Sequence, residues 1–188
     1  MTTAPTERAT AGSFRIRPFA VSDTEEVVAL WRAAGLVKPW NDPYLDIERK
    51  LTVQPELFLV AEAAASGPGS AGSGAGSTVV GSVMAGYDGH RGWVNYLAVA
   101  DPERGTGLGR ALMAEVERLL LERGCPKLNL QVRSANTAVI AFYERLGYRL
   151  DDAVSLGKRL IPDGPDASSA SGGAADASAA PGSAAARG

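Results

Sequence analysis

The sequence predicts a mixed α/β domain in which a central sheet is flanked by helices. Hydrophobic residues make up 45% of its 188 positions, which is enough for one globular core. Apolar residues recur at every second position in several short segments and at every third or fourth position in longer ones. The first spacing is typical of strands and the second of amphipathic helices. In chain order the segments are strand, helix, helix, three strands, helix, strand, helix and strand.

The first half of the chain is expected to supply three strands and two helices. An alternating segment at 14–17 begins the fold. Ser22 and Glu25 have the spacing of a capping box, which predicts a helix that Gly35 is placed to end. A shorter helix is expected at 44–51, followed by strands at 57–61 and 79–85.

The second half alternates strands with helices. A strand at 93–99 leads into a helix at about 107–122, and a strand at 127–133 follows. Asn136 or Thr137 is expected to cap a helix that runs to Leu146, with Gly147 just beyond its end. A last strand is expected at 154–160.

Three segments differ in composition from the rest. Residues 1–13 are small and polar, and residues 163–188 are rich in Ala, Ser and Gly, so both are expected to be disordered. Residues 63–78 form a Gly/Ser/Ala tract between two strand-like segments. We expect an enlarged hairpin loop inserted into one domain at 14–162, because neither half alone has enough apolar residues for a stable fold.

Composition excludes several classes of function. A net charge of −2 gives no electrostatic reason to expect nucleic-acid binding. No apolar segment approaches the ~18 residues that would span a bilayer, and the N-terminus lacks the apolar core of a secretory signal. One cysteine excludes an intrachain disulfide, and one histidine argues against a zinc site, so no metal is expected. These features favour a soluble cytoplasmic protein. The sequence leaves open whether it is a monomer or a homodimer.

A glycine-rich loop joins the strand at 93–99 to the next helix. It consists of Arg104, Gly105, Thr106, Gly107, Leu108, Gly109 and Arg110. A strand that passes through glycines into a helix start exposes backbone N–H groups at the positive end of the helix dipole, which favours a phosphate. An isolated glycine-rich turn is also often only a tight connection, and the loop alone leaves both interpretations open.

Two other phosphate-binding motifs do not fit this loop. A Walker A motif ends in Gly-Lys-Ser/Thr, whereas Gly109 is followed by Arg110 and Ala111. A dinucleotide fingerprint would need glycine in place of Arg110 and an acidic residue near Asn129.

The loop and a later segment together carry a family resemblance. Arg104-x-x-Gly107-x-Gly109 lies between a predicted strand and helix. Residues 136–148 follow in a second strand-to-helix setting and include Asn136 and the pair Phe142-Tyr143. Together they resemble the GNAT superfamily of N-acetyltransferases, over roughly residues 14–161 apart from the inserted tract. Three further segments, at 39–43, 87–92 and 155–160, look like the YpeA-type branch of bacterial GNAT proteins.

The resemblance implies a fold and an activity. The fold is a mixed sheet of about six to seven strands flanked by about four helices. The fourth strand carries a β-bulge and splays from the fifth. The activity is acetyl-CoA-dependent transfer of an acetyl group to a primary amine of a small molecule or peptide, by direct attack in a ternary complex. A non-catalytic acyl-CoA-binding module is the first alternative, and a nucleotide-binding domain of another class is the second.

The resemblance also implies how acetyl-CoA is held. Its pyrophosphate would rest on backbone N–H groups of residues 104–110, with the arginines at both ends as charge partners. The pantetheine arm would pair with the backbone of Leu97, Ala98 and Val99 in the manner of an added strand. Asn136 caps its helix and is a further candidate for contact with that arm.

The candidate catalytic residues belong to two reacting ends. Tyr143 is expected to protonate the departing CoA sulfur, because a phenol with a pKa near ~10 keeps its proton at neutral pH. The alternative role is core packing beside Phe142. On the acceptor side, Asp88 and His90 are candidate bases, while Asn95 stands where some relatives carry a glutamate base. The acceptor pocket is expected to be walled by Trp40, Asn41, Asp42 and Asp88, and the residues do not identify the amine.

Overall fold

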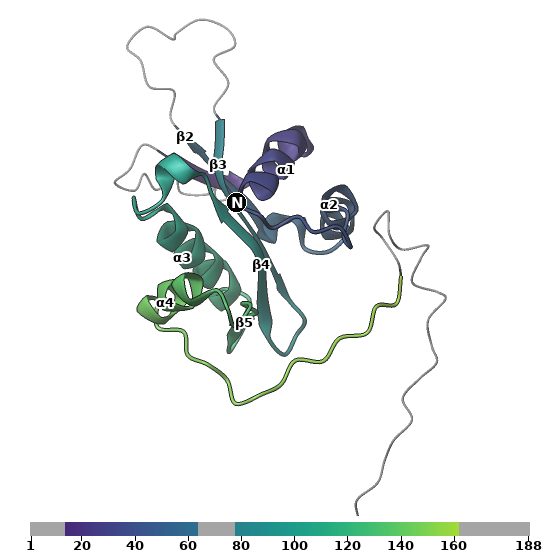
Figure 1. Ribbon diagram of the computed structural model, residues 1–188, viewed down its shortest axis with the longest axis vertical. Coiled ribbons are helices and arrows are strands. Elements are labelled where there is room, and N and C mark those ends of the chain that lie inside the picture. Colours follow the sequence, from purple (N-terminus) through teal and green to yellow (C-terminus); the bar gives the residue numbers. More distant parts are fainter. Residues whose placement is uncertain (1–13, 64–77, 162–188) are drawn as a thin grey trace, which may run out of the picture.

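The computed structural model describes residues 14–63 and 78–161. The terminal segments 1–13 and 163–188, and all but the ends of the tract at 63–78, lie outside the described residues. The described residues form one mixed sheet with helices on both faces (Figure 1).

The sheet has five strands in the order β1-β2-β3-β4-β5. β1, β2, β3 and β4 are antiparallel neighbours, and β5 runs parallel to β4. A parallel neighbour requires a crossover, which α3 provides. The strand bounds are β1 Phe14–Pro18, β2 Phe58–Ala63, β3 Thr78–Tyr87, β4 Gly92–Val99 and β5 Leu128–Leu130.

Two helices pack on each face of the sheet (Figure 1). α1 (Thr24–Ala33) and α2 (Pro43–Leu51) cover one face, where fully buried Val27, Trp31 and Phe58 form a core. α3 (Leu108–Leu121) and α4 (Thr137–Arg145) cover the other. The core under α3 and α4 is built from buried side chains such as Leu112 and Val116.

Helix ends largely follow the predicted chemistry. The Asn136 side chain accepts a hydrogen bond from the Val139 N–H at 3.4 Å, so it caps α4 as expected. Gly147 has φ +94 and ends the helix, because its own N–H and that of Tyr148 bond back to the Glu144 and Tyr143 carbonyls of the last turn.

The expected start of the first helix is wrong. A 3-10 turn, Val21–Asp23, precedes α1, and the buried Asp23 lies at the junction instead of a Ser22 cap. Its carboxylate accepts from the Ala20 N–H at 2.8 Å and pairs with Arg17 at 2.7 Å. The ion pair with β1 therefore determines how the chain enters this helix.

The strand count is lower than expected, five instead of six to seven, because the last strand does not form. β5 covers only Leu128–Leu130, and residues 149–161 contain no helix or strand. Leu156 is 92% exposed, so the alternation at 154–160 has no buried face to fill. This segment contacts the region of β5 through side chains, Lys127 with Asp151 and Gln131 with Ser155, and forms no backbone ladder with it.

Candidate active site

The fourth and fifth strands separate along their length. β5 pairs with β4 only at Gly92, Trp93 and Val94. From Asn95 to Val99, β4 has no strand partner on its β5 side (Figure 1). The predicted opening between these strands is therefore confirmed, and it leaves backbone N–H and C=O groups of β4 available for pairing.

A β-bulge lies where the two strands part. Ser82 is opposite Ala98 and Met84 is opposite Asn95, so Val83 alone faces two residues of β4. One of the two is Tyr96, whose φ of +54 lies in the left-handed region. A bulge in this strand was predicted and is confirmed.

The bulge changes which face each β4 side chain takes. Before it, Val94 packs in the core beneath α3 and α4. After it, Leu97 and Val99 join that core, while Tyr96 and Ala98 face α1 and α2. Without the extra residue, Val94 and Tyr96 would share a face. The bulge thus directs the Tyr96 side chain to the face covered by α1 and α2.

The glycine-rich loop follows β4 and a 3-10 turn, Asp101–Glu103. Gly105 and Gly107 have φ of +81 and +98, and a Cβ on either would meet nothing within 4 Å. Both glycines are therefore required by conformation and border open space. The first turn of α3 begins directly after them and presents N–H groups without intrahelical partners.

The remaining loop residues have mixed surroundings. Leu108 is fully buried against β3 near Gly81, whereas a Cβ on Gly109 would lie 3.3 Å from the Phe142 ring, so Gly109 belongs to the packing between α3 and α4. Arg104 is exposed and pairs with Asp101 at 2.8 Å. The Thr106 hydroxyl donates to the Glu103 carbonyl at 2.8 Å, and Arg110 is exposed.

Tyr143 lies on α4 in the core beneath the two helices and is 8% exposed. Its ring makes edge contacts with Phe142 and Tyr148, at centroid distances of 5.0 and 5.6 Å. Burial raises the pKa of Tyr143 to about 12. Among the described residues the Tyr143 hydroxyl makes no hydrogen bond, and no side-chain oxygen that lacks a partner is fully buried. The Tyr143 oxygen is therefore partly exposed to solvent, although its ring lies in an apolar core.

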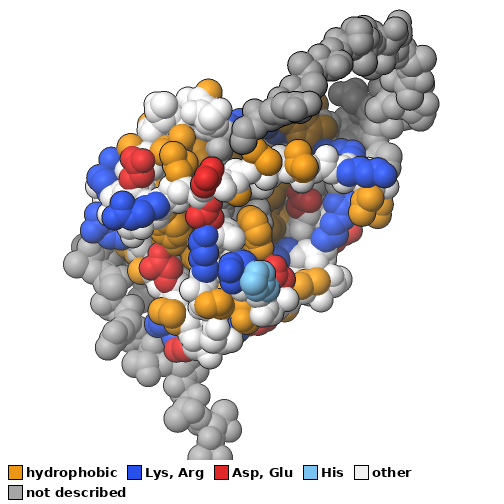
Figure 2. All heavy atoms as spheres, turned by 90° about the horizontal axis from the view of Figure 1, so that it is seen from below, with side chains coloured by type: hydrophobic (Ala, Val, Ile, Leu, Met, Phe, Trp, Pro, Cys, Tyr) orange, Lys and Arg blue, Asp and Glu red, His pale blue; other side chains and the backbone are white. Residues whose placement is uncertain are grey.

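Asp88 and His90 lie in the turn between β3 and β4. The Asp88 carboxylate accepts from the N–H groups of His90 and Arg91 at 2.7 and 2.6 Å, and from the Trp93 indole at 3.3 Å. These bonds, the one from Arg91 first, lower the pKa of Asp88 and make it a weaker base. The one histidine of the sequence is exposed among acidic and basic side chains (Figure 2).

This turn is far from the glycine-rich loop. The turn precedes Gly92 and the loop follows Val99, at the two ends of β4. Eight extended residues span roughly 23 Å. The structure therefore does not bring Asp88 and His90 together with the loop. The Asp88 carboxylate instead stabilises its own turn by accepting hydrogen bonds from the backbone there.

The segment before α2 reaches the bulge. The Asn41 amide donates to the Tyr96 hydroxyl oxygen at 2.6 Å, and the Tyr96 hydroxyl donates to Asp46 at 2.6 Å. Trp40 is half exposed, and the Arg133 guanidinium lies 5.8 Å from its ring centroid. Asp42 instead caps α2 by accepting from the Tyr44 N–H at 2.8 Å. Of the expected acceptor residues, Trp40 and Asn41 thus lie at the opening between the strands.

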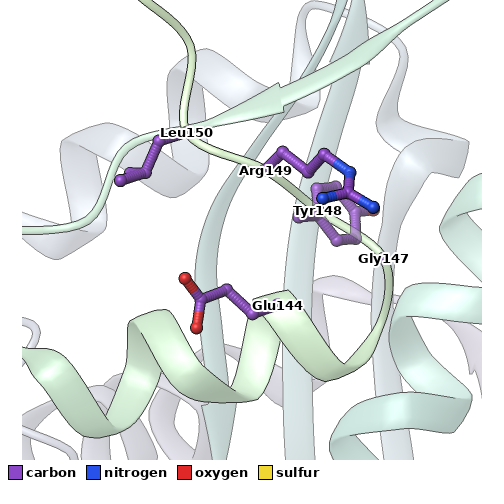
Figure 3. A pocket seen from close by; sticks show the side chains of 5 residues that line it. All are labelled: Glu144, Gly147, Tyr148, Arg149 and Leu150. Carbon is purple, nitrogen blue, oxygen red and sulfur yellow. The ribbon is translucent and has the colours of Figure 1, made fainter.

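A separate hollow of about 300 Å³ lies at the other end of α4. Figure 3 shows Glu144 on the helix and Tyr148, Arg149 and Leu150 of the following segment around it. None of the residues expected in the site lines this hollow.

The family described as Acetyltransferase (GNAT) family matches residues 23–148. The chain belongs to this family. An acetyltransferase of Yersinia enterocolitica is 54% identical over 148 residues, which cover 79% of this chain and 96% of that relative. The GNAT resemblance predicted from the loop and from α4 is therefore confirmed, and the protein is an N-acetyltransferase.

Solved structures agree with this GNAT assignment. Ard1 from Thermoplasma volcanium is 25% identical, with a TM-score of 0.56, and the match covers 74% of this chain and 84% of that one. The structure of AAC(6')-Iy in complex with the bisubstrate analog CoA-S-monomethyl-acetylneamine is 18% identical, with a TM-score of 0.59. That match covers 79% of this chain and 99% of the other and supports the fold.

Sequence reasoning missed three residues at the opening of this GNAT protein: Tyr96, Asp46 and Arg133. One feature of the sequence could have pointed to Tyr96: it carries a hydroxyl, whereas the residues that follow it in the strand are apolar. Asp46 and Arg133 had none, because each acquires its neighbours only through tertiary contacts.

Within residues 14–63 and 78–161 of this GNAT protein, no three side chains of His, Cys, Asp or Glu gather in a group that could hold a metal ion. No helix in those ranges combines the length and the apolar character needed to cross a membrane.

Proposed function

We propose that this acetyltransferase moves an acetyl group from acetyl-CoA to a primary amine, which attacks directly in a ternary complex. One observation carries the proposal: among the described residues no strand pairs with β4 on its β5 side after Val94, and a single 3-10 turn connects the end of β4 to the glycine-rich loop. An extended arm beside that edge would lead a phosphate group to the loop and a reactive end to the bulge.

The loop residues fit a pyrophosphate. Open space at Gly105 and Gly107 lets a ligand approach the backbone, and the N-terminus of the 14-residue helix α3 favours negative charge. Arg104 and Arg110 add positive charge at the surface of the loop. The backbone of Leu97, Ala98 and Val99 would pair with the pantetheine arm, and Asn136 lies at the start of α4 to contact it. Acetyl-CoA supplies the activated thioester.

Tyr143 is the proposed proton donor. A pKa of about 12 keeps the hydroxyl protonated throughout the neutral range, so it can donate to a departing thiolate. The incoming amine must lose a proton, since with a pKa near ~10.4 only about one molecule in a thousand is neutral at pH 7. Because Asp88 is held by three donors in its turn, we assign that proton to solvent in the opening.

Thiol release tests this proposal. Purified protein is given acetyl-CoA and a panel of small amines and peptides, and CoA is measured with a thiol reagent. Turnover with at least one amine is expected, and Tyr143→Phe should lower kcat by about 10²-fold with little change in acetyl-CoA affinity. Tyr87→Phe is the matched control, because that hydroxyl bonds only the Gly89 carbonyl in the distant turn, at 3.2 Å.

Calorimetry separates the alternatives. Binding of acetyl-CoA without turnover on any amine would support a non-catalytic module and reject the proposal. Binding of ATP without binding of acetyl-CoA would point to a nucleotide-binding domain instead.

A further inference from the structure

Two adjacent residues connect the two sides of the opening between β4 and β5. The Asn41 amide donates to the Tyr96 hydroxyl on the bulge of β4, and the guanidinium of Arg133, which follows β5, lies 5.8 Å from the Trp40 ring centroid. Because Trp40 and Asn41 are adjacent in the chain, the two contacts lie on either side of one short segment. This segment therefore bridges the opening between β4 and the chain that follows β5.

The β4 side of the bridge is acidic. Asp46 accepts from the Tyr96 hydroxyl at 2.6 Å and from the Asn41 amide at 3.2 Å. Hydrogen bonding to a carboxylate makes the phenol oxygen more electron-rich, because negative charge is shared through the bond. Tyr96 also stacks on Trp31 at a centroid distance of 4.1 Å, which fixes its ring. Asp46 also pairs with Arg49 at 3.5 Å, so this side offers carboxylate and phenol oxygens, rather than a lone negative charge, to an ammonium or amine.

The β5 side is basic. Arg133 is exposed, and among the described residues no carboxylate pairs with it. Its guanidinium lies over the Trp40 ring, and its carbonyl accepts the Asn136 N–H at 2.8 Å. This cation–π contact holds the guanidinium at the opening, and its planar fork of donors matches carboxylate or phosphate oxygens. The N-terminus of α4 lies close to Arg133 and, like the arginine, favours a negatively charged ligand.

We infer that the acceptor is an amine that also carries an anionic group. Its amine lies on the Tyr96–Asp46 side and its anion on Arg133, with the Trp40 ring covering the space between them. This inference rests on the proposed acetyl transfer and names the class of its acceptor. An amine lacking the anion would leave Arg133 without its counter-charge, and an acid lacking the amine would have no nucleophile.

Matched pairs of amines test the inference. Each pair differs only by its anion: lysine with cadaverine for a carboxylate, and O-phosphoethanolamine with ethanolamine for a phosphate. CoA release is measured for all four at fixed acetyl-CoA concentration. We expect kcat/KM to be at least tenfold higher for the anionic member of one pair, and the favoured pair identifies the anion.

Variants assign the preference to this site. Arg133→Gln should reduce the preference at least tenfold by raising the KM for the anionic amine, with the KM for acetyl-CoA unchanged. Arg133→Lys should retain only part of the preference, since it keeps charge but loses the planar fork. Arg123→Gln is the matched control, because that arginine pairs with Glu56 at 2.9 Å elsewhere on the surface.

Each remaining outcome overturns a different statement. Equal rates within both pairs, or faster reaction of cadaverine and ethanolamine, would reject the acceptor class while leaving acetyl transfer intact. A preference that survives Arg133→Gln would reject the site. No CoA release with any amine of the larger panel would reject the proposed function, and the acceptor class with it.

Discussion

Gly107→Ala separates the conformational need for glycine in the loop from its role toward a ligand. Gly107 has φ +98, and an added Cβ would meet nothing within 4 Å. The substitution therefore causes no clash. It should lower the free energy of unfolding by about 1–2 kcal/mol, solely because alanine must adopt a positive φ. In a domain of this size that cost corresponds to a fall in Tm of roughly 2–8 °C.

Gly35→Ala is the matched control. Gly35 ends α1 with φ +68, and a Cβ there also meets nothing within 4 Å. Both variants place alanine at a positive φ with free space around its Cβ, but only Gly107 adjoins the N-terminus of α3. We expect a loss of Tm by differential scanning fluorimetry in both variants, smaller for Gly35→Ala because φ +68 lies within the left-handed α region. Only Gly107→Ala should weaken acetyl-CoA binding, by tenfold or more in calorimetry. The reasoning fails if Gly107→Ala binds acetyl-CoA like the parent protein, or if Gly35→Ala weakens binding equally.

Three further predictions concern packing, the β3–β4 turn and pH. Gly92→Ala should lower stability by about 1–3 kcal/mol in urea unfolding, because its Cβ would lie 2.9 Å from the Cys125 sulfur; an unchanged midpoint would mean that the β4–β5 junction yields easily. Asp88→Asn should lower Tm while leaving kcat unchanged, since its carboxylate holds the turn; a large fall in kcat would restore Asp88 as a base. A hydroxyl with its pKa raised to about 12 loses its proton only near that pH, so kcat should show no alkaline decline from Tyr143 between pH 7 and 10, and a decline that Tyr143→Phe removes would contradict this.

The parts of the fold that depend on local chemistry could be predicted from the sequence. Gly147 ends α4 and Asn136 caps it because the required backbone angles and side-chain oxygen are properties of those residues themselves. The glycine-rich loop between a strand and a helix was recognisable for the same reason. Five of the six expected strands form, since each pairs with a neighbouring strand and the helices cover the faces of the sheet.

The failures depend on partners that no local pattern specifies. The segment at 154–160 alternates like a strand, but alternation does not supply a neighbour with free hydrogen-bonding groups. Asp88 was a candidate base because an acidic loop residue near a histidine can accept a proton. The sequence does not show that the N–H groups of His90 and Arg91 and the Trp93 indole all donate to its carboxylate. Tyr96 was overlooked because its direction depends on an extra residue in β4, and a period of two cannot locate that residue.

The close contact at Gly109 also links the two ends of the proposed cofactor site. Gly109 lies in the first turn of α3, and the Phe142 ring against it belongs to the residue before Tyr143. Glycine at this position thus sets how near the proposed phosphate-binding end of α3 comes to the proposed proton donor on α4. Even alanine would push the Phe142 ring by a few tenths of an ångström. The third glycine of the motif therefore matters less for touching a ligand than for fixing the spacing between two groups that we propose act on one acetyl-CoA.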